Sequence, residues 1–198
     1  MIFAATRPAF TSNRTDTVLL AATAVVWAAL ELRQGLNRRA GAQNQDRGSL
    51  NVVRAVSFAA AVVAAMALGV DTARFPVTPP VFGVALALMW AGIALRQWCF
   101  ITLGRYFTFT VKTSPDQRVV TAGPYRVLRH PSYSAILLIL TGLGITYGNW
   151  LSLAAIVTIS AAGLIYRIHV EEAALSQALG AEYTDFVRTR KRLIPFVW

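Results

Sequence analysis

The sequence is short of charged residues, cysteine and histidine, and each shortage excludes a class of protein. Only 14% of the 198 residues are charged and 56% are hydrophobic, whereas about a quarter of the residues of soluble domains are charged. The one cysteine, Cys99, excludes an internal disulfide. With two histidines, one cysteine and no ligand spacing, we expect no metal site.

The apolar residues are gathered in long blocks. No signal peptide is evident before the first block, because the first sixteen residues are polar and mixed and no small-residue cleavage site follows a short apolar core. A transmembrane helix needs about 20 mostly apolar residues. We therefore predict an all-α integral membrane protein with about five transmembrane helices and a cytoplasmic C-terminal helical tail. Four is the alternative, since the first and fourth blocks are short. The blocks cover residues 17–32, 52–70, 80–103, 134–147 and 150–166.

The net charge of +10 comes mainly from seventeen arginines, against two lysines. Three basic residues (Arg7, Arg14 and Arg74) lie in the N-terminus and in the connection 71–79, and the rest lie in 33–54, 96–132 and the tail from Arg167. With five spans the rich segments share one side, which the positive-inside rule makes cytoplasmic, with the N-terminus outside. The excess of basic residues is therefore interpreted as a signal for orientation in the membrane, and it would also attract membrane lipids with anionic headgroups. We expect no nucleic acid partner.

Polar residues gather in the C-terminal half of the chain. We predict an N-terminal transmembrane scaffold over residues 1–79 and a functional core over 80–198, with three transmembrane helices, the loop 104–132 and the tail. Near the span ends we expect four ionisable side chains to snorkel toward the interface; they are Glu31, Arg33, Arg54 and Arg96.

The stretch GPYRVLRHPSY, residues 123–133, comes directly before the fourth block. Pro131 suits the first position of a helix. His130 then lies at the helix N-terminus, where free N–H groups favour an anion. With Tyr125 and Tyr133 beside it, this end could bind a zwitterionic or carboxylate-bearing ligand with a flat base. The alternative is an interfacial belt in which His130 is merely exposed.

A second candidate group lies where the fifth span leaves the membrane. Arg167 and Glu171 are four residues apart and project from one helix face, whereas Glu172 points elsewhere and is expected to contribute little. The simple alternative is a surface ion pair worth about 0.3–0.5 kcal/mol. Ionisable residues at a membrane boundary are, however, functional candidates. His169, on another face, is expected to be structural or exposed.

These motifs together resemble the isoprenylcysteine carboxyl methyltransferase family. The resemblance covers roughly residues 103–195 and rests on GPYRVLRHPSY, on Arg167-x-x-x-Glu171-Glu172, on Gly180-Ala-Glu-Tyr183 and on Arg192-Leu-Ile-Pro195. It implies an integral membrane enzyme that takes S-adenosyl-L-methionine as methyl donor, so the core would be catalytic. No G-x-G-x-x-G motif marks a soluble Rossmann-type methyltransferase.

The resemblance also implies roles for particular residues. Glu171 would hold the donor's amino group, and Arg167 would meet the substrate's carboxylate. The other donor contacts it implies are Gln117, Arg118, Val119, Val120, Tyr125, His130, Pro131, Ser132 and Tyr133.

The chemistry asks little more of the protein than position and a dry site, since methyl transfer from a sulfonium is an in-line displacement. A carboxylate nucleophile is already ionised near pH 7 and needs no general base. The acceptor is expected to be a lipophilic small molecule or a lipidated substrate. The abundance of arginine and alanine suits a GC-rich bacterial genome, so we expect a bacterial plasma membrane. A thiol, a phospholipid amine or another small lipid is then an alternative acceptor.

Two other function classes stay open from the sequence. A reductase resembling the sterol reductases, using a reduced nicotinamide cofactor, could share the tail, and a non-catalytic membrane scaffold is the third possibility.

Two local expectations concern the C-terminal half. Gly148-Asn149 predicts a tight hairpin between the last two spans, and Gly142 and Gly144 predict close helix packing. A tail helix over about 182–192 is predicted to be amphipathic, with Tyr183, Phe186 and Val187 on one side. It would lie against the membrane surface or fold back over the pocket.

Overall fold

The computed structural model describes residues 7–35, 43–107, 109–110, 112–113 and 118–198. Within these residues the α-helices are α1 (Arg14–Gly35), α2 (Ser49–Ala67), α3 (Pro79–Leu103), α4 (Pro131–Thr146), α5 (Trp150–Leu179) and α6 (Ala181–Thr189). Short 3-10 helices are η2 (Ala9–Ser12), η3 (Asp71–Ala73), η4 (Gly104–Tyr106) and η5 (Gly123–Arg126). Two strands of two residues each, β1 (Gln43–Asn44) and β2 (Lys112–Thr113), pair antiparallel.

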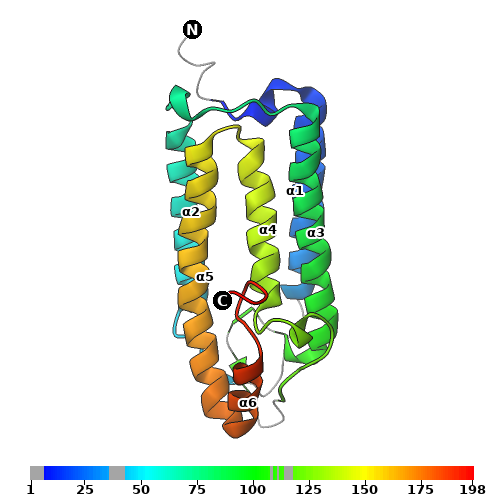
Figure 1. Ribbon diagram of the computed structural model, residues 1–198, viewed down its shortest axis with the longest axis vertical. Helices are drawn as coiled ribbons and strands as arrows, with labels where there is room; N and C mark the ends of the chain where they lie inside the picture. Colours follow the sequence, from blue (N-terminus) through cyan, green and yellow to red (C-terminus); the bar gives the residue numbers. More distant parts are fainter. Residues whose placement is uncertain (1–6, 36–42, 108, 111, 114–117) are drawn as a thin grey trace.

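The five long helices lie side by side, with α4 in the middle (Figure 1). Helix α3 packs against α4 and α1, and α5 packs against α4 and α2. Four of the helices, α1, α2, α3 and α5, are long and apolar enough to cross a membrane, whereas α4 is apolar but has 16 residues. The prediction of an all-α integral membrane protein is therefore confirmed, with four to five apolar helices.

Glycines let α3 and α4 approach closely. A Cβ atom on Gly92 would lie 2.7 Å from the Ala135 carbonyl oxygen, and one on Gly142 would lie 2.4 Å from that of Ala85. Small residues at a helix interface allow the backbones to meet at such distances, and van der Waals packing then holds helices together in lipid. The expectation of close packing around Gly142 is confirmed.

The turn between α4 and α5 is as short as predicted, and Asn149 fixes it. The side-chain oxygen of Asn149 accepts hydrogen bonds from the backbone N–H groups of Leu151 and Ser152, which caps α5. Its side-chain nitrogen donates to the carbonyl oxygens of Ala67 and Val70, at 3.1 and 3.2 Å. The same residue therefore joins the hairpin to the end of α2.

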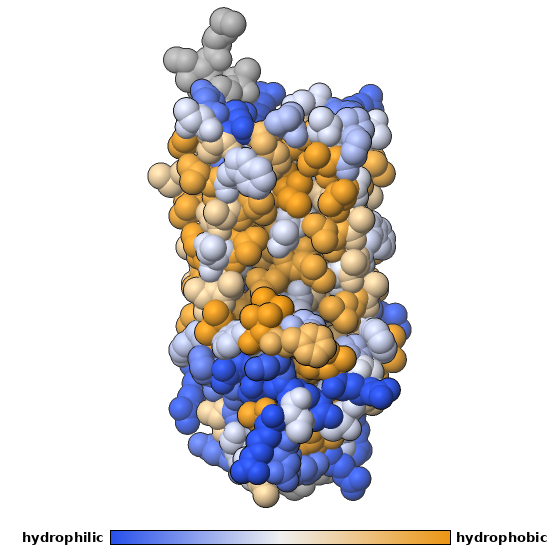
Figure 2. Space-filling view, viewed as in Figure 1, coloured by the Kyte–Doolittle hydropathy of each residue, from blue (hydrophilic) through white to orange (hydrophobic). Residues whose placement is uncertain are grey.

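Apolar side chains form a wide band around the middle of the molecule, with hydrophilic ones along its top edge and gathered at its lower end (Figure 2). Helix α5 has 30 residues, or about 45 Å at 1.5 Å per residue, and this exceeds the hydrocarbon thickness of about 30 Å. Its last turns therefore extend past the apolar part and carry α6 (Figure 1).

Arg96 does not snorkel, so this expectation is wrong. The side chain is buried near the C-terminal end of α3, where its guanidinium forms an ion pair with Glu31 of α1. In an apolar helix bundle a buried arginine needs such a partner, because an unpaired charge there is costly.

Candidate functional site

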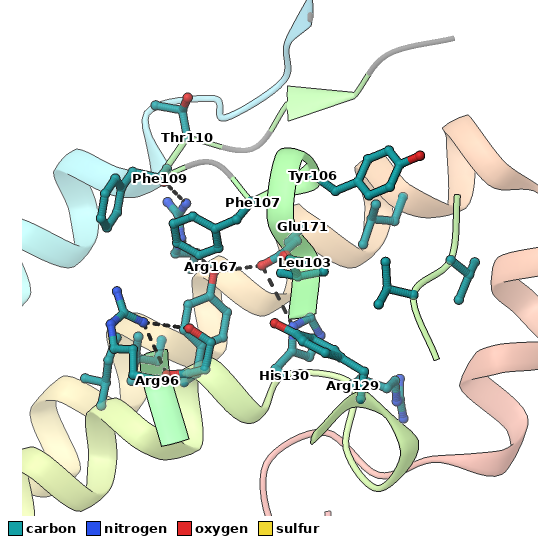
Figure 3. Close-up of a pocket in the computed structure, with 18 of the residues that line it drawn as sticks. Arg96, Leu103, Tyr106, Phe107, Phe109, Thr110, Arg129, His130, Arg167 and Glu171 are labelled. Carbon is teal, nitrogen blue, oxygen red and sulfur yellow. Dashed lines mark hydrogen bonds and ion pairs between the residues drawn. The ribbon is translucent and has the colours of Figure 1, made fainter. Parts of the chain in front are cut away.

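A cavity of about 380 Å³ lies at the hydrophilic end of the bundle. This volume is within the range of small-molecule sites, about 300–1,000 Å³. Side chains from α2, α3, α4, α5 and α6 line it, together with residues 106–107, 109–110 and part of the segment 118–130. Figure 3 shows labelled residues of its wall, among them Arg167, Glu171 and His130.

The structure brings together most of the predicted site residues. Gln117 lies outside the described residues, and Pro131 is buried at the first position of α4 without lining the cavity. The remaining predicted residues all line it; they are Arg118, Val119, Val120, Tyr125, His130, Ser132, Tyr133, Arg167 and Glu171.

His130 occupies the N-cap position of α4, as the motif predicts, without a capping hydrogen bond from its side chain, and it is buried rather than exposed. Its ring stacks on that of Tyr133, with centroids 5.6 Å apart and planes 17° from parallel. Nε2 lies 3.2 Å from a carboxylate oxygen of Glu172, and Nδ1 lies 3.8 Å from one of Glu171. The interpretation of His130 as an exposed belt residue is therefore wrong.

The hydroxyl of Tyr133 joins Arg167 to Glu171. It accepts a hydrogen bond from Nε of Arg167 at 2.9 Å and donates one to Glu171 at 2.7 Å. Tyr133 comes from the first turn of α4, whereas the two charged residues are one turn apart on α5. The simple alternative of an exposed surface pair is wrong, because Arg167 is buried.

Arg167 has further partners in the N-terminal half of the chain. Its Nη1 donates to the carboxylate of Asp46 and to the hydroxyl of Ser49, each at 3.0 Å. Its Nη2 donates to the backbone carbonyl of Phe109 (Figure 3). A guanidinium has five N–H donors in a fixed fork, so the protein itself engages most of them.

Glu171 and Glu172 lie next to different nitrogens of the His130 ring, and Glu172 has further partners. Its carboxylate accepts hydrogen bonds from Arg129 and from Arg192, each at 2.8 Å, as well as lying next to His130. Glu172 thus joins the loop before α4 to the C-terminal segment, and the expectation that it contributes little to donor binding and methyl transfer stays a prediction.

Helix α6 folds over the cavity, which is one of the two placements predicted for the tail. Tyr183 and Phe186 are buried and line the cavity. Burial raises the pKa of Tyr183 above its ordinary value, with Glu172 and Glu171 adding to the effect. Its hydroxyl is buried and has no hydrogen-bond partner among the residues that the structure describes.

Tyr125 is another tyrosine that lines the cavity. Burial raises its pKa well above the ordinary value, and the nearby Cys99 and Glu171 raise it further. The phenol is therefore a neutral hydrogen-bonding group at any pH near 7.

Two acidic residues of the N-terminal half were not predicted to matter at the site. Asp46 contacts Arg167, and Glu31 pairs with Arg96, whose Nη1 donates to the hydroxyl of Ser132 at 2.6 Å. The sequence offers one signal for both residues, because each is an acidic residue in or beside a connection that is otherwise basic. An acidic residue there indicates a specific partner. His169 is exposed, as expected. Within the described ranges no group of three or more potential ligands could hold a metal ion.

The fold resembles that of a known membrane enzyme. The chain matches the structure of the eukaryotic intramembrane Ras methyltransferase ICMT (isoprenylcysteine carboxyl methyltransferase) with a TM-score of 0.57 and 24% identity. The match covers 75% of this chain and 51% of that one. At this identity the likeness establishes the fold.

Sequence comparison confirms the resemblance to a family. Residues 85–177 match the model of the isoprenylcysteine carboxyl methyltransferase (ICMT) family. Protein-S-isoprenylcysteine O-methyltransferase B of Arabidopsis thaliana is 32% identical over 118 residues, which is 59% of each chain. The corresponding Tribolium castaneum enzyme is 31% identical over 58% of this chain and 41% of its own, and YpbQ of Bacillus subtilis (strain 168) is 27% identical over 44% and 57%. The matches thus span little more than half of the plant relative, and they leave out much of the N-terminal half here.

Proposed function

We propose that this protein is an integral membrane methyltransferase that takes S-adenosyl-L-methionine as donor and methylates a lipophilic acceptor. The observation that carries the proposal is one cavity, at the hydrophilic end of an apolar bundle, lined by Glu171, Tyr133 and His130. All three lie in the segment that matches the family model.

The residues of the cavity fit this donor. The carboxylate of Glu171 lies at the wall, where it can accept hydrogen bonds from an ammonium group. Leucine, valine and aromatic side chains that line the cavity with Tyr183 offer an apolar surface to a flat base. The hydroxyl of Tyr183 has no hydrogen-bond partner among the described residues, and we propose that it hydrogen-bonds to the donor. When bound, the donor supplies an activated methyl group on a sulfonium.

The protein's part in the reaction is position and exclusion of water. Tyr133 holds Glu171 in place, and α6 covers the cavity on its hydrophilic side. An acceptor with an isoprenyl-like tail would keep that tail among the apolar helices and bring its reacting group to the cavity. The plant and insect relatives are named for O-methylation of protein S-isoprenylcysteine, and a thiol, a phospholipid amine or another small lipid is the alternative acceptor.

The role of Arg167 toward the acceptor's carboxylate stays a prediction. The division into an N-terminal scaffold, residues 1–79, and a catalytic core, residues 80–198, stays one too. Asp46 nevertheless belongs to the first part and touches the second through Arg167.

We further propose that the hydrophilic end with the cavity faces the cytoplasm of a bacterial cell and that the N-terminus lies outside its plasma membrane. The placement of the basic residues supports this orientation through the positive-inside rule.

Glu171→Gln tests the assignment of the donor's ammonium. Loss of the charge should weaken binding of S-adenosylmethionine by about 2 kcal/mol or more, roughly 30-fold, because a charge pair shielded from water loses one partner. Isothermal titration calorimetry of the purified protein in detergent measures this change. Asp185→Asn is the control, since Asp185 lies on α6 with its side chain 77% exposed. Equal affinities for Glu171→Gln and the wild type would refute the assignment.

A further inference from the structure

An acidic residue outside the segment that matches the family model binds Arg167, an arginine that lines the cavity. Asp46 belongs to the connection before α2, whereas the family match begins at residue 85. The side chain of Asp46 is 7% exposed, and that of Arg167, to which it is bound, is 6% exposed. Asp46 itself is not part of the cavity wall.

The backbone around Asp46 is arranged to hold its carboxylate against α2. Its oxygens accept hydrogen bonds from the Ser49 hydroxyl at 2.9 Å and from the backbone N–H of Leu50 at 3.1 Å. Arg47 has a φ of 47° and Gly48 a φ of 77°. A left-handed conformation is unfavourable for arginine, so the surrounding contacts must hold this turn in place.

A second loop closes on Arg167 from the other side. The strand β1, just before Asp46, pairs with β2, and the carbonyl of Phe109 just before β2 accepts from Arg167. The two loops and the first residue of α2 thus place a carboxylate, a carbonyl and a hydroxyl around one guanidinium. The guanidinium also donates a hydrogen bond from Nε to the hydroxyl oxygen of Tyr133.

We infer that Asp46 is a positioning residue of the donor site, acting on Glu171 through Arg167 and Tyr133. The carboxylate of Asp46 fixes the guanidinium, Nε of the guanidinium fixes the Tyr133 oxygen, and the Tyr133 hydroxyl donates to Glu171 at 2.7 Å. The inference rests on the proposed binding of the donor's ammonium at Glu171.

The alternative is that Asp46 serves stability alone, as a buried ion pair between α5 and the start of α2. Breaking a buried pair destabilises a protein strongly whether or not it touches a site. A stability role would lower the melting temperature of a variant and leave the affinity of the folded fraction unchanged. A positioning role changes the affinity, and it does so through Tyr133.

The test is a double-mutant cycle on the binding of S-adenosylhomocysteine, the demethylated donor, to the full-length protein in detergent. Asp46→Asn should weaken binding about tenfold, and Tyr133→Phe should weaken it by a similar factor. Both changes interrupt the same chain of contacts, so their effects on affinity should not add. The affinity of the double variant should be within a few-fold of that of the single variant that binds less tightly. Ser49→Ala removes one hydrogen bond to each charged group and should weaken binding in the same direction by a smaller factor, which keeps the test available if Asp46→Asn does not fold.

Ser152→Ala is the matched control. The Ser152 hydroxyl donates to the carbonyl of Ala64 at 2.7 Å, so it joins α5 to α2, whereas Asp46 joins α5 to the connection just before α2. Ser152 is not part of the cavity wall. This variant should melt earlier and bind with wild-type affinity. Wild-type affinity in Asp46→Asn, or fully additive losses in the cycle, would overturn the inference and leave the proposed function standing. No binding by the wild type would overturn both.

Discussion

The polar side chains around the cavity differ in how completely the protein satisfies them. Arg167 is surrounded by acceptors from three segments of the chain. The hydroxyl of Tyr183 is as well buried, yet the part of the chain that the structure describes provides no partner for it. A buried polar group without a hydrogen bond costs about 1–3 kcal/mol. The two residues should therefore respond in opposite ways to substitution.

Tyr183→Phe should stabilise the ligand-free protein and weaken donor binding. Removing the unpaired hydroxyl relieves the desolvation cost, which corresponds to a rise of about 2–4 °C in melting temperature for each kcal/mol recovered in a protein of this size. The proposal that this hydroxyl hydrogen-bonds to the bound donor predicts that S-adenosylmethionine binds the variant several-fold more weakly. Thermal melting followed by dye fluorescence and calorimetric titration give the two values.

Tyr166→Phe serves as the control for this change, because Tyr166 is exposed on α5. It should alter neither quantity. A lower melting temperature together with unchanged affinity in Tyr183→Phe would show that the hydroxyl has a structural partner instead.

At the scale of elements, the C-terminal segment is bound to the loop before α4 by both backbone and side chains. The backbone N–H groups of Arg129 and His130 donate to the carbonyls of Lys191 and Arg192, at 2.8 and 3.0 Å. Glu172 adds the charged contacts, holding Arg129 and Arg192 on one carboxylate. The segment thereby keeps α6 over the cavity.

Glu172→Gln should loosen this end of the molecule. It leaves two arginines without their shared anion, which we expect to cost about 2–3 kcal/mol, below the range for fully buried pairs because the Arg192 side chain is 25% exposed. The melting temperature should fall, and amide hydrogen exchange measured by mass spectrometry should accelerate over residues 181–198. Asp185→Asn should do neither. Unchanged exchange in Glu172→Gln would mean that the backbone bonds alone hold the segment.

The elements were largely predictable from the sequence, because apolar blocks bounded by proline and glycine determine where membrane helices lie. Each predicted block falls on a helix, and the predicted tail helix over 182–192 corresponds to α6 at Ala181–Thr189. The site was predictable where its residues are neighbours in one motif, as with His130 and Tyr133. The pairs Asp46–Arg167 and Glu31–Arg96 were not, since their members are 121 and 65 residues apart and no helical or strand period relates them.

At the scale of the whole molecule, charge and apolarity are separated along the bundle (Figure 2). Two basic residues that lie beside the cavity, Arg118 and Arg129, are in the segment predicted to be cytoplasmic. The apolar sides of the helices face outward, with Phe58, Met66 and Ile101 at least 73% exposed. Such surfaces suit lipid and would aggregate in water.

The proposed orientation predicts where a single reactive thiol can be labelled. In a Cys99→Ser background, a cysteine at Asp185 should be reached by a membrane-impermeant maleimide only after the cells are opened. A cysteine at Thr72, in the connection between α2 and α3, should be labelled on intact cells once any outer barrier is permeabilised. The reverse pattern would contradict the assignment of the cavity to the cytoplasm.

The central claim, that the cavity binds a sulfonium methyl donor, is tested most directly by titrating the purified wild-type protein with S-adenosylmethionine in a calorimeter. The account predicts saturable binding of one donor per chain with a dissociation constant of roughly 1 μM, or about −8 kcal/mol. It also predicts comparable binding of S-adenosylhomocysteine and none of a reduced nicotinamide cofactor. An absence of heat and of any thermal shift at millimolar S-adenosylmethionine would contradict it, and binding of the nicotinamide cofactor in its place would point to a reductase.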